Sequence, residues 1–299
     1  MAFRKKIAVI GSINMDLTAR TERLPSKGET VSADALLYVP GGKGANQAVA
    51  AARLGGDVCL FGCVGDDVFA EQLIENLKQN GVDTTHICKT PGVSSGIAMI
   101  TVASLSADNC IVVVPGANKN VTPAYVDTVL DAILEADILV LQNEIPAEKI
   151  EYVIDLGCRA EKTILYNPAP ATPLPAGTME KISYLTPNEH EAALLFPGDR
   201  SLSDLLNAPG GKLIVTLGER GVAAWENGEL LHIPPRPAHV VDTTGAGDTF
   251  NGAFAYALAE GYDFRHALRF ANAAASLSTE RPGAQGGMPT RDAVEACGE

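Results

Sequence analysis

The sequence has few aromatic residues and few charges. Aromatic residues make up 5% of its 299 positions, with a single tryptophan, and charged residues make up 20%. Disordered chains combine low hydrophobicity with high net charge, whereas here hydrophobic residues reach 46%, enough to fill a large core. The composition excludes a disordered or fibrous protein, and the length fits two modest domains or one large α/β unit.

Positive charge is scarcer than negative charge. The chain has 23 Lys and Arg against 36 Asp and Glu, which gives a formal net charge of −13 and a pI near 4.8. A field of this sign repels nucleic-acid phosphates and anionic lipid surfaces, so we expect no nucleic acid and no membrane among the partners. Small anions are not excluded, because a few oriented backbone amides can hold a phosphate locally.

The chain has no C-x-x-C pair and no dense cysteine framework. Cys59 and Cys63 have a spacing that a metal would accept on a helix, but their surroundings predict a strand, and no histidine lies nearby in sequence. We therefore expect no metal there. We interpret all six cysteines as reduced, mostly buried thiols: Cys59, Cys63, Cys88, Cys110, Cys158 and Cys297.

Long apolar runs are also missing. The first apolar run is too short for a signal peptide and stops at Gly11. The longest uncharged stretch, 90–107, contains a proline, two glycines and four serines, so it cannot form a continuous membrane helix of about 20 residues. The sequence predicts a soluble, cytoplasmic protein.

Short apolar runs alternate with helical patterns along the chain. The runs are apolar on both faces, which is typical of parallel strands covered by helices on both sides. We predict one domain over residues 1–299, an α/β fold with a doubly wound, mostly parallel sheet flanked by helices. The predicted strands are 7–10, 58–64, 138–141, 163–165, 182–185 and 213–217. The predicted helices include 45–54, 69–79, 123–134, 147–156, one ending near 260, and 264–279.

Two segments break this rhythm. Residues 18–38 and 96–114 are rich in strand-forming residues, and a polar turn near Asn109 divides the second. We expect them to pair in space as a small β-sheet lid, inserted from about 15–40 and 95–115, over the ends of the main strands. Two separate edge hairpins are the alternative that periodicity leaves open.

The segment Asp242-Thr-Thr-Gly-Ala-Gly-Asp248 is the most informative one. Its glycines place successive amides at the start of a predicted helix, where the dipole and the free N–H groups attract negative charge. Asp248 then either caps the helix or accepts a proton from a hydroxyl that attacks a phosphate. The residues alone leave both roles open.

A second glycine-rich segment spans residues 40–48. Its glycines permit close backbone approach, and Lys43 and Asn46 at a helix start suit a neutral polyhydroxylated ligand. The segment is not a Walker loop, because Leu37 stands where the first glycine of that motif belongs.

A third polar segment follows the first predicted strand. Asn14 and Asp16 lie just beyond its end, at the edge where open α/β sheets bind ligands. A dinucleotide fingerprint is weak here because only Gly11 is present, and a plain turn would equally explain the two polar residues.

Taken in order, these segments resemble the PfkB-type carbohydrate kinases and, among them, the ribokinases. The resemblance covers essentially the whole chain, through residues 11–16, 41–48, 188–191, 242–248 and 281–285. It implies phosphorylation of D-ribose at its 5-hydroxyl by ATP, giving D-ribose 5-phosphate and ADP. The alternatives are a kinase of the same family acting on deoxyribose, fructose or a nucleoside, and a non-catalytic sugar- or nucleotide-binding regulator.

The resemblance also implies roles for the matching residues in catalysis and sugar binding. Asp248 would be the general base facing the 5-hydroxyl, and the amides of a glycine-rich anion hole would stabilise the transferring phosphoryl group. That anion hole comprises Gly245, Ala246 and Gly247. The residues that would hold ribose, besides Asp248, are Asn14, Asp16, Gly42, Lys43, Asn46 and Glu144.

Nucleotide and ion sites follow from the same resemblance. Asn188 and Glu191 together would organise Mg²⁺, with Glu191 acting through water. The ATP site would comprise Asn188, Thr216, Gly218, Gly221, Gly247 and Asn272. A K⁺ activator would be bound, mostly by backbone carbonyls, at Asp242, Thr244, Ser278, Arg281, Gly283 and Gly287.

Three departures from the family pattern qualify these roles. Gly287 stands where relatives often supply a hydroxyl, which predicts one ligand fewer and weaker K⁺ binding. Asn272 stands where relatives frequently have histidine, so hydrogen bonding would replace stacking on the adenine. The interval from Asn188 to Thr216 leaves room for one helix and a second short one. The resemblance also implies a homodimer formed through the lid.

Overall fold

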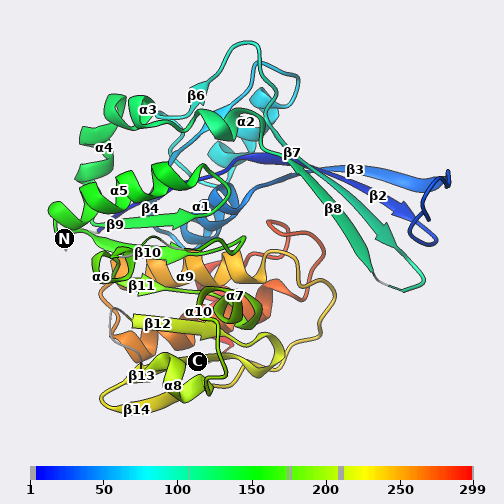
Figure 1. Cartoon of the computed structure of the whole chain (residues 1–299). Coiled ribbons are helices and arrows are strands. Elements are labelled where there is room, and N and C mark those ends of the chain that lie inside the picture. Colours follow the sequence, from blue (N-terminus) through cyan, green and yellow to red (C-terminus); the bar gives the residue numbers. More distant parts are fainter. Residues whose placement is uncertain (1–4, 107, 174, 176, 208–211, 298–299) are drawn as a thin grey trace.

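The computed structural model describes residues 5–106, 108–173, 175, 177–207 and 212–297. Figure 1 shows a central sheet between two layers of helices, and a second, smaller sheet that projects to one side. The central sheet has eight strands in the order β14-β13-β12-β11-β10-β9-β1-β4. The neighbouring strands from β12 to β4 are parallel. At the other edge, β13 pairs antiparallel with β12 and β14 pairs antiparallel with β13. The predicted α/β class with a mostly parallel sheet is confirmed.

The strands of the central sheet alternate in chain order with helices. They are β1 (Lys6–Ile10), β4 (Asp57–Phe61), β9 (Ile138–Gln142), β10 (Thr163–Asn167), β11 (Tyr184–Leu185), β12 (Lys212–Thr216), β13 (Val222–Glu226) and β14 (Glu229–Ile233). The helices are α1 (Lys43–Arg53), α2 (Ala70–Gln79), α3 (Pro123–Thr128), α4 (Leu130–Glu135), α5 (Ala147–Arg159), α6 (Thr178–Lys181), α7 (Glu189–Leu195), α8 (Leu202–Leu206), α9 (Ala246–Ala259), α10 (Phe264–Ser278) and α11 (Arg291–Ala296). Two 3-10 turns, η1 (Gly116–Asn120) and η2 (Gly218–Arg220), lie in loops.

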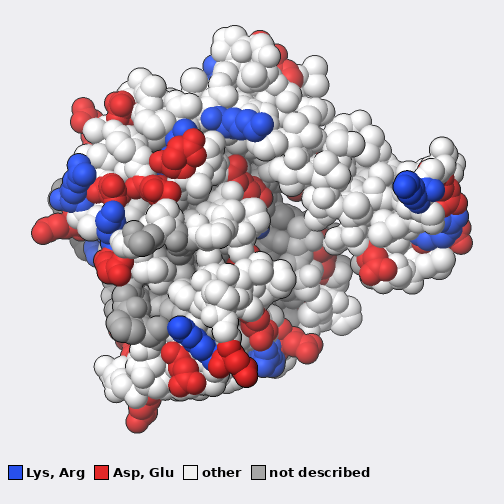
Figure 2. All heavy atoms as spheres, viewed as in Figure 1, with Lys and Arg blue, Asp and Glu red and all other residues white. Residues whose placement is uncertain are grey.

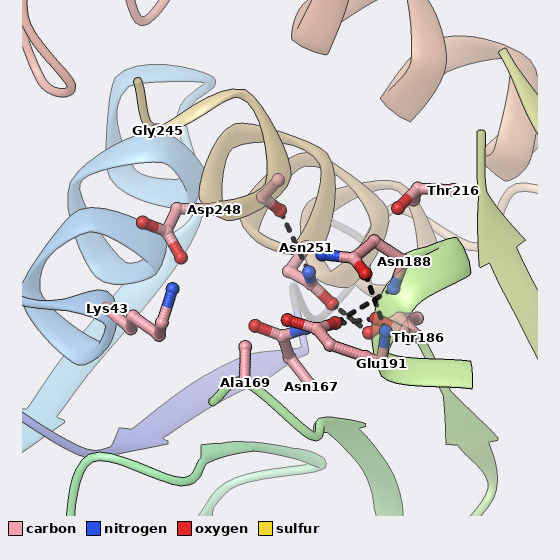
Figure 3. Close-up of a pocket in the computed structure, with 11 residues that line it drawn as sticks. Lys43, Asn167, Ala169, Thr186, Asn188, Glu191, Thr216, Gly245, Asp248 and Asn251 are labelled. Atoms are coloured by element: carbon pink, nitrogen blue, oxygen red, sulfur yellow. Dashed lines mark hydrogen bonds between the residues drawn. The ribbon is translucent and has the colours of Figure 1, made fainter. Parts of the chain in front are cut away.

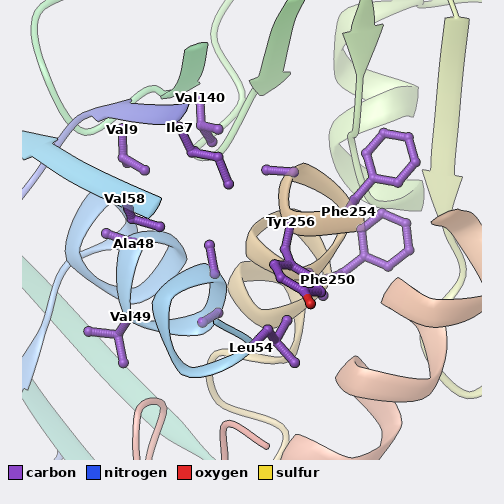
Figure 4. Close-up of a cluster of buried hydrophobic side chains, with 14 of the residues drawn as sticks. Ile7, Val9, Ala48, Val49, Leu54, Val58, Val140, Phe250, Phe254 and Tyr256 are labelled. Carbon is purple, nitrogen blue, oxygen red and sulfur yellow. The ribbon is translucent and has the colours of Figure 1, made fainter. Parts of the chain in front are cut away.

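Side chains of the central strands fill two separate cores. On β1, Ile7 and Val9 point to the face covered by α1, α9 and α10, whereas Ala8 and Ile10 point to the face covered by α5. This alternation is the period-2 geometry of a strand, and it explains why the strand is apolar on both faces. Figure 4 shows the first core, where Phe250 and Phe254 of α9 lie beneath the strands.

The two β-rich segments pair in space, as predicted. The small sheet has the order β3-β2-β7-β8, formed by β2 (Asn14–Thr21), β3 (Ala33–Gly41), β7 (Gly96–Ala103) and β8 (Asn109–Val114). Strands β2 and β7 are parallel, and Asn14 is in register with Gly96. The alternative of two separate hairpins is therefore wrong. The plain-turn interpretation of Asn14 and Asp16 is also wrong, because β2 starts at Asn14.

Two predicted elements differ in the structure. The run 58–64 is not one strand: it divides at Gly62, and β5 (Cys63–Val64) pairs with β6 (Cys88–Lys89) in a separate sheet. A Cβ at Gly62 would lie 2.8 Å from the carbonyl oxygen of Gly11, so glycine permits the divergence. The helix 123–134 divides at Val129, which has φ −118° and ψ 12°, outside the helical region. The interval after Asn188 holds α7 and α8, as expected.

The cysteines are less buried than predicted. Cys63 is buried and Cys59 partly buried, and burial raises the pKa of each thiol to about 12. The other four thiols are exposed: Cys88, Cys110, Cys158 and Cys297. No group of three or more His, Cys, Asp or Glu side chains in the described ranges could hold a metal ion. Within those ranges, no helix is long and apolar enough to cross a membrane.

Candidate active site

A polar pocket lies where β10, β11 and β12 end, facing the start of α9 (Figure 3). In open parallel sheets this edge is the usual ligand site, because the loops that follow the strands converge there. Each strand contributes a polar residue at or just after its last position, namely Asn167, Thr186 and Thr216. The remaining lining residues are Lys43, Ala169, Asn188, Glu191, Gly245, Gly247, Asp248 and Asn251.

The glycine-rich turn before α9 has a backbone conformation that favours glycine. Gly245 is the N-cap of α9 with φ 77°, in the left-handed region, and a Cβ there would lie 2.7 Å from the Cβ of Ala284. The first turn of a helix leaves N–H groups without partners inside the helix, and the dipole adds positive potential. The amide of Ala246, however, already donates to the Thr243 carbonyl at 3.2 Å, so it is engaged within its own loop.

Asp248 lies in the first turn of α9 and is 7% exposed. Both carboxylate oxygens accept hydrogen bonds from α1: Oδ2 from Asn46 Nδ2 at 2.9 Å and Oδ1 from Gln47 Nε2 at 3.1 Å. No side-chain cap is formed at this helix start in the part of the chain that is described. The capping role that the sequence left open is therefore not what holds Asp248. Its carboxylate faces the pocket, held by another helix.

Lys43 is the cation of this pocket. It opens α1, its backbone amide donates to Glu144 Oε2 at 3.0 Å, and its amine is directed toward Asp248 in Figure 3. The negative charge of Asp248 raises the pKa of Lys43; burial opposes this, and Glu144 adds to it. Lys43 therefore stays charged at neutral pH and offsets the surrounding carboxylates.

The glycines at the start of α1 allow close packing of protein backbone. A Cβ at Gly42, which has φ 90°, would lie 2.8 Å from the amide of Asn14, and one at Gly44 would lie 2.6 Å from the carbonyl carbon of Gly11. The close approach predicted for this loop thus brings α1 against the β1–β2 connection. Lys43, Asn46 and Asn14 are drawn to one region as a result.

The residues beside the small sheet form a second polar group. Asn14 is 3% exposed, and its Oδ1 accepts from Asn118 Nδ2 at 2.7 Å. Asp16 lies against Gly41, where any Cβ would collide with its carboxylate. Burial raises the pKa of Asp16 to about 7, and the negative charges of Glu144 and Asp248 add to the effect. Asp16 and Glu144 are thus electrostatically coupled to the pocket although they do not line it.

Some of the residues assigned to the nucleotide line the pocket, and the others lie outside its lining. Asn188 and Thr216 form a β-bridge and line the pocket together. Gly218 and Gly221, with φ 56° and 88°, shape the η2 turn after β12 outside the pocket lining. Asn272 is buried in α10, and its Nδ2 donates to the Pro234 carbonyl at 2.8 Å. That amide therefore anchors the segment after β14.

Asn188 and Glu191 form a capping box at the start of α7. The Asn188 side chain accepts from the Glu191 amide, and the Glu191 side chain accepts from the Asn188 amide, each at 2.8 Å. Burial raises the pKa of Glu191, although the Asn188 amide and Lys43 oppose this. One Glu191 oxygen is used by the cap, and the residue lines the pocket.

Asp242 joins the two loops assigned to K⁺. Its Oδ1 accepts from the Thr244 amide at 2.9 Å and its Oδ2 from the Gly283 amide at 2.8 Å. Burial alone would raise the pKa of Asp242, but hydrogen bonding by the Thr244 side chain and by these two amides outweighs it and holds the pKa below its usual value. Gly287 packs against the Ser278 carbonyl so closely that a Cβ would not fit without movement. Arg281 is exposed.

Sequence reasoning missed several polar residues of the site. Gln47 contacts Asp248, Asn167 and Thr186 line the pocket, and Gln142 lies behind them. A usable signal was present: Gln142 and Asn167 are the final residues of otherwise apolar strands, and polar residues at that position lie at the ligand edge.

The sequence and the structure both match known carbohydrate kinases. The model of the pfkB family of carbohydrate kinases matches residues 4–291. A ribokinase of Bacillus subtilis is 50% identical over 97% of this chain and 98% of its own length, and a deoxyribokinase of Salmonella typhi is 36% identical over 95% of both. The structure of Arabidopsis thaliana ribokinase complexed with ribose and ATP matches with a TM-score of 0.91 and 34% identity, over 99% of both chains.

Proposed function

Because the chain belongs to the pfkB family of carbohydrate kinases, we propose that it is a ribokinase, which transfers the γ-phosphoryl group of ATP to the 5-hydroxyl of D-ribose. The products are D-ribose 5-phosphate and ADP. The observation that carries the proposal is Asp248, a carboxylate aimed into a polar pocket at a helix N-terminus and held there by residues of α1.

In the proposed reaction, a base acts on the attacking hydroxyl and positively polarised groups surround the transferring phosphoryl group. Asp248 accepts the proton of the 5-hydroxyl as its oxygen attacks the γ-phosphorus in line, and ADP leaves. Free amides at the start of α9, with Lys43 beside them, stabilise the negative charge of the transferring group. Asn14 and Asp16 of β2 would orient the sugar from the lid side, and Asn46 of α1 would do so beside Asp248.

Magnesium fits the nucleotide side of the pocket. Asn188 and Glu191 present oxygen ligands there, and a hard cation prefers oxygen. When bound, Mg²⁺ neutralises phosphate charge. Glu191 would hold it through water, because the capping box already occupies one carboxylate oxygen.

We infer a K⁺ site between the 242–244 loop and residues 278–287. Asp242 stays ionised and ties the two loops together, which presents carbonyl oxygens and a negative charge to a large cation. Gly287 offers no side-chain ligand, and its packing against Ser278 leaves no room for one. Activation by K⁺ is therefore expected to be modest.

An assay of ADP release tests the proposed function. MgATP is combined with ribose, deoxyribose, fructose, adenosine or no sugar, each in potassium and in potassium-free buffer. We expect turnover with ribose that rises modestly with potassium, and little ATP hydrolysis without sugar, because a closed lid excludes water. Turnover with another acceptor alone would keep the mechanism and discard ribose as the substrate. Nucleotide or sugar binding without any turnover would favour a regulator.

Ribose binding should weaken below neutral pH. The ionised Asp16 accepts hydrogen bonds from sugar hydroxyls, and its pKa of about 7 means that this form is lost as the pH falls through neutrality. We expect the dissociation constant for ribose to be constant well above pH 7 and to rise toward about tenfold per pH unit below it.

Calorimetric titration with ribose between about pH 5 and pH 9 measures this dependence. Asp16→Asn, which does not titrate, is the matched variant and should bind ribose weakly at every pH. A wild-type affinity that does not change across this range would contradict the role given to Asp16.

We propose that the lid also pairs two copies of the chain. Figure 2 shows that the middle of the lid carries no Lys, Arg, Asp or Glu on the visible face. On one face of this sheet the exposed apolar side chains include Ile111 at 52% and Val113 at 48% on β8, and Leu37 at 40% on β3, whereas Thr101 belongs to the other face. Apolar faces on a projecting sheet are typical of subunit contacts.

Light scattering should give about twice the chain mass of 31.3 kDa. The variant Ile111→Asp places a charge on the apolar strand and should give a monomer, whereas Thr101→Asp on the neighbouring strand β7 tests whether any added charge has that effect. A monomeric wild type at working concentration would refute the dimer.

A further inference from the structure

Behind Asp248 lies a row of three buried amide side chains. Gln47 on α1 and Gln142 at the end of β9 are fully buried, and Asn167 at the end of β10 is 6% exposed. Gln47 Nε2 donates to Asp248 Oδ1 and to Asn167 Oδ1, both at 3.1 Å. Gln47 Oε1 in turn accepts from Gln142 Nε2 at 2.8 Å. The base is thus connected, through Gln47, to two strands of the central sheet.

The two ends of this row determine how every amide is oriented. A carboxylate only accepts, so Gln47 must turn its NH₂ group toward Asp248. Asn167 Nδ2 donates to the Thr186 carbonyl at 2.9 Å, which leaves its oxygen facing the same NH₂ group. The oxygen of Gln47 therefore faces Gln142, which must donate. Neither glutamine can flip without losing a hydrogen bond.

Gln142 lowers the stability of the fold through one of its side-chain atoms. Among the described residues, its Oε1 is buried and has no hydrogen-bond partner, and it lies against Gly11 where any Cβ would collide with it. A buried acceptor without a partner destabilises a fold, and an apolar side chain of the same size would avoid that loss. Such a group in a native structure calls for an explanation other than stability.

The same polar row reaches the anion hole. Beyond Asn167, the Thr186 hydroxyl donates to Asn251 Oδ1 at 2.5 Å, and Asn251 Nδ2 donates to the Gly247 carbonyl at 2.8 Å. The base and the start of α9 are consequently fixed to one framework. A base must lie within hydrogen-bond reach of the proton it accepts, so small rotations of the carboxylate would matter.

We propose that Gln47 and Gln142 are positioning residues for Asp248: Gln142 fixes the orientation of Gln47, and Gln47 holds Oδ1 of the base. The inference rests on the proposed kinase activity and adds two residues to it. Neither glutamine is among the residues that line the pocket. Gln142 places a donor behind Gln47, and its unpaired oxygen lowers the stability of the fold in return.

The variant Gln142→Met tests this most sharply, because methionine has nearly the shape of glutamine and no polar atom that needs a partner. Methionine removes the unpaired Gln142 Oε1 but also takes the donor from Gln47 Oε1, so we expect the Tm to stay close to that of the wild type. We expect kcat to fall about tenfold, with the KM values for ribose and ATP within about twofold of the wild type. A merely structural role would lower the Tm together with kcat, and not kcat alone.

Gln47→Met should lower kcat further, by about 10- to 100-fold. If Gln142 acts only through Gln47, the double variant will be no slower than Gln47→Met alone. Leu141→Met is the matched control, since it changes the neighbouring residue of the same strand, whose side chain packs in the opposite core, and should leave kcat unchanged. Gln142→Met remains informative even if Gln47→Met fails to fold.

A normal kcat in Gln142→Met, or effects of the two variants that multiply in the double variant, would overturn the positioning role alone, because the wild type would still turn over. A wild type that phosphorylates no sugar would overturn the proposed function and this inference together. The assay of the wild type is therefore read first.

Discussion

We expect Asp248→Asn to lower kcat by about 100- to 10,000-fold while the dissociation constant for ribose stays close to that of the wild type. The carboxylate is 7% exposed, faces the pocket and accepts two hydrogen bonds from α1, so it is oriented before the sugar arrives. An amide keeps nearly the same shape but cannot accept the proton of the 5-hydroxyl. Steady-state kinetics with saturating MgATP gives kcat, and calorimetry gives the ribose affinity.

A matched control separates chemistry from helix stability. Asp263 caps α10, its side chain accepting from the His266 amide at 2.8 Å. Asp263→Asn makes the same change at a helix start outside the pocket and should leave kcat unaltered. Thermal unfolding of both variants shows whether the new NH₂ group at position 248, which must face Asn46 or Gln47, disturbs the fold. Turnover by Asp248→Asn at the wild-type rate would exclude the base role.

We expect Lys43→Met to lower kcat/KM for ATP by about 100-fold or more. The ammonium group lies among Asp248, Glu144, Glu191 and Asp16, and the first of these has the largest effect on its pKa. Without it, the pocket presents carboxylates to a polyanionic nucleotide, and the transferring group loses its nearby cation. Kinetics with varied ATP at low and high salt measures both effects.

Lys78→Met provides the control for net charge. Lys78 lies exposed in the last turn of α2, so its removal changes the charge of the protein equally but outside the pocket. Its kinetics should match the wild type. Equal losses in the two lysine variants would show that overall charge, and not the position of Lys43, governs ATP binding.

The fold was predictable where apolar pattern and length agree. Strand β9 is buried at all five positions and reads as a central strand. The antiparallel pair β13–β14 was missed because its residues are only partly apolar, although Asn227-Gly228 between them is a strong hairpin signal. The division of the predicted strand at Gly62 depends on the close approach of Gly11, which is distant in sequence. No local sequence pattern therefore predicts it.

The site was predictable where motifs carry it. Asn46 and Asp248, assigned from two separate glycine-rich segments, are joined by a hydrogen bond in the structure. Gln47 follows Asn46 inside a helix with a mostly apolar sequence, so no local pattern marks it as a site residue. The role of Gln142 depends on its partner and on its unpaired oxygen, and both are properties of the packed core.

Identification of the product tests the central claim most directly. The wild type is incubated with ribose and MgATP, and the sugar phosphate is examined by phosphorus NMR with proton coupling. Transfer to the 5-hydroxyl predicts a triplet, because the new phosphate ester is coupled to the two protons on C5. A doublet would place the phosphate on a carbon bearing one proton, and inorganic phosphate alone would show ATP hydrolysis; either result would contradict the account.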